Sequence, residues 1–74
     1  MLLSDLNINE CGYIRKINHS GRELRRLYDL GFTYGTKVCL VLISPSKLIK
    51  AYLVWDSIIA LRNSDASKIE VEYA

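Results

Sequence analysis

Few side chains in this 74-residue chain could act as nucleophiles, general bases or metal ligands. A hydrolase or transferase needs a nucleophile beside a base, paired carboxylates, a phosphate-binding glycine loop or a cluster of metal ligands. His19 is the only histidine, and we expect it in an exposed turn, because one ligand does not make a metal site. Asp29 is expected in the last turn of a helix, bonded to a nearby amide or arginine. We therefore predict a protein that is not an enzyme, with no catalytic residue, no cofactor and no metal site.

The two cysteines, Cys11 and Cys39, stand far apart and form no C-x-x-C pair, which argues against a zinc site. The N-terminus lacks the basic start of a signal peptide, and no apolar run approaches the ~20 residues that cross a membrane. We therefore expect a cytoplasmic protein, and cytosolic cysteines are mostly reduced. The sequence thus predicts two free thiols.

Binding residues are better represented than catalytic ones. Residues 15–26 hold five of the ten Lys and Arg residues, although the net charge is only +2. We interpret this cluster as an electrostatic docking patch for an acidic protein surface, with two nearby tyrosines as aromatic anchors. An ordinary solvated helix face, with the tyrosines partly in the core, is the alternative. The predicted partner-binding residues are Arg22, Arg25, Arg26, Tyr28, Tyr34 and Lys16.

A second candidate surface is the segment Leu48–Trp55, which has apolar residues at both alternating sets of positions. If one face packs inward, the other presents a patch that would serve docking or weak self-association. The alternative, which we favour, is a core strand in which Trp55 closes one end of a barrel.

The helix that carries the arginines is predicted from its caps and its apolar spacing. Ser20 takes the N-cap position with Glu23 three residues later, which is the pattern of a capping box. Leu24, Leu27 and Leu30 form one apolar stripe at helical spacing.

The end of this helix is marked as clearly as its start. Gly31 falls where the chain needs a positive φ, and Phe32 is placed to fold back on Leu27. Gly35 then breaks the chain before a strand begins at Val38.

The remaining chain is rich in strand patterns. A helical turn is expected near the N-terminus with Leu3 and Leu6 inward, and Pro45 is expected to end the second strand. In the last strand, Ile69, Val71 and Tyr73 are predicted to face inward. The strands are expected over residues 12–18, 37–44, 47–55, 58–62 and 68–73. The near-continuous apolar run of the second strand predicts burial on much of both faces. Five short strands and one helix predict an all-β fold, a small closed barrel, because closure removes unpaired sheet edges.

The helix and the strand after it also carry a family resemblance. The run Arg25-Arg26-Leu27, Asp29-Leu30-Gly31-Phe32-Thr33, Gly35-Thr36 and Val38 resembles the signature of the FeoA family, R-R-L-x-D-[ML]-G-[LF]-T-x-G-x-x-V. Pro45 stands where the family commonly has a proline, and residues 60–66 are similar to its closing L-R-x-S-E-A.

The resemblance implies a fold and a function. It implies a single SH3-like barrel over residues 1–74, of about five strands, with the helix inserted between the first two long strands. It also implies an accessory protein of ferrous iron uptake that binds the cytosolic part of FeoB, a membrane GTPase and permease, and modulates its activity or assembly. Contact with the membrane would then be indirect, through that partner.

Two other classes remain open on the sequence alone. The basic cluster would also suit a small barrel that binds nucleic acid, although the low net charge and the single Phe argue against it. A stand-alone copy of the SH3-like domain that ends DtxR-type iron-dependent regulators is the other alternative. Polyproline binding is not expected, because it needs several exposed rings set close together.

Overall fold

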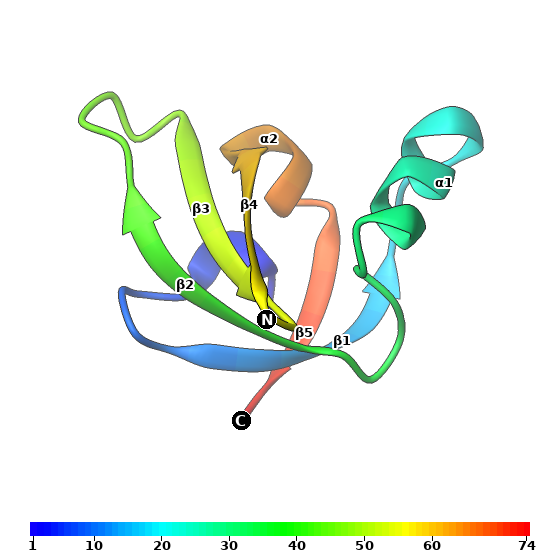
Figure 1. Ribbon diagram of the computed structural model, residues 1–74, viewed down its shortest axis with the longest axis horizontal. Coiled ribbons are helices and arrows are strands. Elements are labelled where there is room, and N and C mark those ends of the chain that lie inside the picture. The colour runs from blue at the N-terminus through cyan, green and yellow to red at the C-terminus, as the bar shows by residue number, and fades with distance from the viewer.

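The computed structural model describes residues 1–74 as five antiparallel strands with one helix inserted between the first two (Figure 1). The sheet order is β4-β3-β2-β1-β5. This confirms the predicted all-β, SH3-like architecture. The elements are η1 (Leu3–Asp5), β1 (Cys11–Ile17), α1 (Gly21–Asp29), β2 (Lys37–Ile43), β3 (Ile49–Val54), β4 (Ser57–Arg62), α2 (Asn63–Ala66) and β5 (Ile69–Tyr73).

The core is one cluster of 13 apolar residues, in which Tyr52 and Phe32 are the largest fully buried side chains. Leu3 and Leu6 belong to it, as predicted. Burial raises the pKa of Tyr52 to about 12, because the phenolate would lose its hydration. The remaining members are Ile14, Leu27, Val38, Leu40, Val54, Leu61, Ala66, Ile69 and Val71.

Two burial predictions for the strands are wrong. Tyr73 is 56% exposed, because it lies at the end of β5, opposite Gly12, beyond the residues that cover the core. Leu42 is 62% exposed although β2 reads as a strand buried on both faces. A register shift between Leu40 and Leu42 in the β2–β3 pairing interrupts the ladder there, and β2 alternates only up to that point.

Helix α1 begins and ends at the predicted residues. Ser20 occupies the N-cap position, but its hydroxyl caps no amide, so the predicted capping box is absent. At the other end Gly31 has a φ of +102°, and its N–H donates to the carbonyl of Tyr28. The Phe32 N–H donates to the carbonyl of Leu27. These two bonds form the glycine-ended helix cap that the sequence predicts.

The sheet has two ends that do not pair with each other, so the barrel is not closed by a ladder between β4 and β5. The free side of β5 is covered by the N-terminus, since Val71 exchanges hydrogen bonds with Met1 and Leu2 bridges to Glu70. No segment pairs in this way with the free side of β4. The predicted removal of all unpaired edges by closure is therefore wrong for this strand.

The two cysteines form a disulfide, which overturns the prediction of free thiols. Cys11 lies directly opposite Cys39 in the antiparallel pairing of β1 with β2. The spacing of the two cysteines in the sequence does not predict this disulfide, because only the register of the two strands brings the side chains together. Neither helix is long and apolar enough to cross a membrane.

Candidate partner-binding surface

The outward face of α1 carries the predicted arginine cluster. Arg22, Arg25 and Arg26 are all exposed and lie on one side of the helix, opposite the buried Leu27. None of the three takes part in an ion pair. Tyr28 is half exposed beside them. We call Arg22, Arg25, Arg26 and Tyr28 the arginine face.

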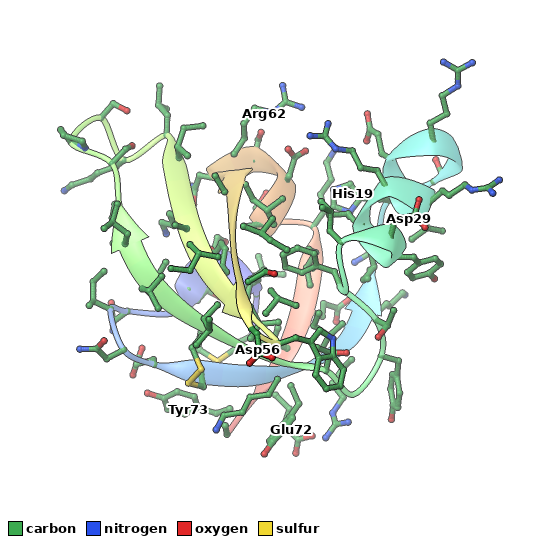
Figure 2. All side chains as sticks on the ribbon, viewed as in Figure 1. His19, Asp29, Asp56, Arg62, Glu72 and Tyr73 are labelled. Atoms are coloured by element: carbon green, nitrogen blue, oxygen red, sulfur yellow. A yellow bond between two sulfur atoms is a disulfide. The ribbon has the colours of Figure 1, made fainter.

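The other two predicted residues lie elsewhere. Lys16 is on β1, opposite Glu70 of β5. Tyr34 lies between α1 and β2, where the Arg15 guanidinium stands 5.5 Å from the centre of its ring. Arg15 Nε also donates to Glu72 Oε2 at 2.7 Å, and this bond raises the pKa of Arg15. Figure 2 shows Glu72 far from Asp29, which marks the position of α1. The six predicted partner-binding residues therefore lie in separate regions of the surface.

Tyr34 belongs instead to an aromatic groove that the sequence did not indicate. Tyr13, Tyr34 and Trp55 line a hollow of about 630 Å³. Trp55 is 74% exposed, so it does not close a barrel end. An added Cβ at Gly31 would lie 3.0 Å from Trp55 Cδ1, which places the indole against the end of α1. Three exposed aromatic rings therefore lie close together, although the sequence was expected to lack such a group.

The outer face of the β3–β4 hairpin is also apolar. Tyr52 and Val54 point into the core, while Leu53 and Ile58, which pair across the two strands, are exposed. The segment Leu48–Trp55 thus combines the two roles considered for it. Its inner face is core and its outer face is a bare apolar patch.

His19 is not the exposed turn residue that its neighbours indicate. Its side chain is only 2% exposed, and its Nε2 lies 3.8 Å from Asp65 Oδ1. Neither ring nitrogen has a hydrogen-bond partner. Figure 2 places His19 between α1 and the sheet, on the side where Arg62 ends β4. The prediction failed because the residues that bury His19 come from distant parts of the chain.

His19 lines a cavity of about 390 Å³ between α1 and the sheet. Its apolar lining comes from both sides, from Leu27 and Leu30 of the helix region and from Ile49, Ala60 and Leu61 of the hairpin. Its charged lining is Glu23, Arg26, Arg62 and Asp65. We call this cavity the α1–β4 groove. No three His, Cys, Asp or Glu side chains are grouped so as to hold a metal ion.

Comparison with known proteins identifies the family. The FeoA domain family matches residues 1–73. The chain is 32% identical over 72 residues to an Fe(2+) transport protein A/Fe(2+) transporter FeoB fusion protein of Porphyromonas gingivalis. That match covers 97% of this chain but only 8% of the fusion protein.

Solved structures agree with this match. Iron(II) transport protein A from Clostridium thermocellum superposes with a TM-score of 0.95 at 28% identity, over 100% of this chain and 46% of that one. The zinc complex of FeoA from Stenotrophomonas maltophilia, a procaryotic SH3 domain protein, gives 0.82 at 28% identity, over 97% and 89%. A manganese-dependent transcriptional repressor gives 0.86 at 13% identity, over 100% and 41%, which shows a shared fold alone. The chain belongs to the FeoA family.

Proposed function

We propose that this chain is a non-catalytic accessory protein of ferrous iron uptake, which binds the cytosolic part of FeoB and modulates its activity or assembly. The observation that carries the proposal is the fusion relative, in which a region similar to this chain and an Fe(2+) transporter form one polypeptide. Such a fusion holds two partners at high effective concentration. A domain that meets such a transporter without a fusion needs a binding surface of its own.

The arginine face is the surface we propose for this encounter. Its three guanidinium groups are exposed and have no carboxylate partner in this chain, so they attract an acidic surface without first breaking an ion pair. Charge of this kind speeds association and orients the partner, while an aromatic side chain such as Tyr28 adds contact area. A small binding protein shifts the balance between the conformations of a transporter by binding one of them more tightly than another.

The test replaces Arg22, Arg25 and Arg26 together with Glu and uses wild-type and variant proteins as bait for solubilised membranes of the native host. We expect the wild-type bait to recover FeoB and the variant to recover at least about tenfold less, because each reversed charge turns attraction into repulsion. A variant with Lys37, Lys47 and Lys68 changed to Glu has the same net charge and is the control.

Equal recovery of FeoB by both variants would remove the arginine face from the binding site. Recovery of nucleic acid in place of FeoB by the wild-type bait would overturn the proposed function itself.

A further inference from the structure

The free edge of β4 offers backbone hydrogen bonds to a partner. β4 pairs with β3 in a regular antiparallel register, in which Ala60 lies opposite Ala51. Just beyond the strand, the Asn63 N–H donates to the carbonyl of Leu48, which marks a hydrogen-bonded pair. Because such pairs alternate along the ladder, Ile59 and Leu61 bond to β3, while the backbone groups between them face away from it.

The outward-facing backbone groups belong to Ile58, Ala60 and Arg62. All three residues are exposed, and none forms a backbone hydrogen bond outside the ladder. An uncovered edge of this kind is a template for another strand. The opposite edge of the sheet is already occupied by Met1 and Leu2.

The α1–β4 groove lies beside this edge at Ala60, Leu61 and Arg62. The α1–β4 groove has helix residues such as Leu27 and Leu30 on one wall and Ala60 on the other. A guest strand that pairs with β4 from Ile58 to Arg62 is about 13 Å long. Because α1 forms the far wall, a single peptide fits beside β4 more readily than the edge of a second sheet.

The polar groups of the groove indicate the chemistry of the guest. Arg62 Nε is already bonded to Asp65 Oδ2 at 3.1 Å, whereas Arg26 has no ion-pair partner. His19 presents two buried ring nitrogens without hydrogen bonds. A guest carboxylate would pair with Arg26, and a guest polar group would satisfy the His19 ring once that ring rotates toward the groove.

We infer that the α1–β4 groove accepts an extended segment of the partner, which adds to β4 as a sixth strand. The segment has apolar side chains directed at the groove and one acidic residue directed at Arg26. This inference rests on the proposed function, because the segment belongs to the cytosolic part of FeoB.

Amide hydrogen exchange, followed by NMR in the free chain and in its complex with the cytosolic part of FeoB, tests the inference. We expect the amides of Ile58, Ala60 and Arg62 to become at least about tenfold more protected, because each gains a bond. The intervening amides of Ile59 and Leu61 are already bonded to β3 and should change little. This alternation is specific to strand addition. Contact with side chains alone would not produce it.

A pair of variants at one position supplies the second test. Ala60→Pro removes the outward N–H without removing a β3–β4 hydrogen bond, and edge strands accept proline. Ala60→Ser keeps the N–H. We expect Ala60→Pro to weaken binding roughly tenfold, as for loss of one backbone hydrogen bond, and Ala60→Ser to bind like wild type.

The outcomes separate the two proposals. If the wild-type chain binds the cytosolic part but the β4 amides show no alternating protection, strand addition is wrong and the proposed function stands. If the wild-type chain does not bind at all, the proposed function fails with it.

Discussion

At the scale of single residues, His19 is the most unusual feature of this protein. Burying an imidazole without hydrogen bonds is unfavourable to folding. Its neighbour Asp65 is 3.8 Å away, too far for a hydrogen bond. The guest segment that we infer for the α1–β4 groove would complete the bonding of this ring.

Replacing His19 with Leu tests this explanation. We expect the free energy of unfolding to rise by about 1–3 kcal/mol, because an unsatisfied polar group is replaced by an apolar one of similar size. Binding to the cytosolic part of FeoB should weaken in the same variant. Urea unfolding and a binding isotherm measure the two effects. A less stable variant with unchanged binding would show that His19 serves the fold alone.

Ionisation of the Tyr52 phenol makes the free energy of unfolding depend on pH in the alkaline range. Below pH 10 its phenol is neutral in both the folded and the unfolded chain, but between pH 10 and about 12 only the unfolded chain ionises. The unfolded state is favoured there, and stability falls by up to about 3 kcal/mol as the pH rises through that window. Urea unfolding from pH 9 to pH 12 measures the slope. Tyr52→Phe should flatten it, and an unchanged slope in that variant would contradict the assignment.

At the scale of elements, the end of α1 joins the helix to the rest of the fold. Gly31 provides the positive φ for the helix cap, and its backbone also lies against Val54 and Trp55 of the β3–β4 hairpin. One glycine thus sets both the end of the helix and its distance from the hairpin. The width of the α1–β4 groove depends on that distance.

Two alanine substitutions separate these contributions. Gly31→Ala forces a side chain into a φ of +102° and places its Cβ 3.1 Å from Val54 Cγ1. Gly35→Ala meets a φ of +81° with no atom within 4 Å. We expect Gly31→Ala to cost about 2–3 kcal/mol of unfolding free energy and Gly35→Ala about 1 kcal/mol. Thermal or urea unfolding compares them, and equal losses would show that backbone strain alone matters.

Features that depend on neighbouring residues could be predicted from the sequence. The helix cap at Gly31 and Phe32 is one, because both of its hydrogen bonds lie within a few residues. The burial of His19, the Cys11–Cys39 disulfide and the exposure of Trp55 could not be predicted in this way. Each depends on which distant strands and helices meet, and at which register. The arginine face followed from helical spacing, whereas the α1–β4 groove needed the packing of α1 against the hairpin.

At the scale of the whole molecule, the protein is a small barrel on which the proposed binding features lie on or beside α1 and its C-terminal end. The arginine face and the α1–β4 groove share Arg26, so a partner that meets the arginines also reaches the free edge of β4. The aromatic groove of Tyr13, Tyr34 and Trp55 lies at the C-terminal end of α1, next to Gly31.

The decisive experiment on the proposed interaction is a calorimetric titration of the chain with the purified cytosolic part of FeoB from the same host. We expect saturable binding at one site, weaker at high salt because the arginine face is screened. Absence of binding at both low and high ionic strength would contradict it.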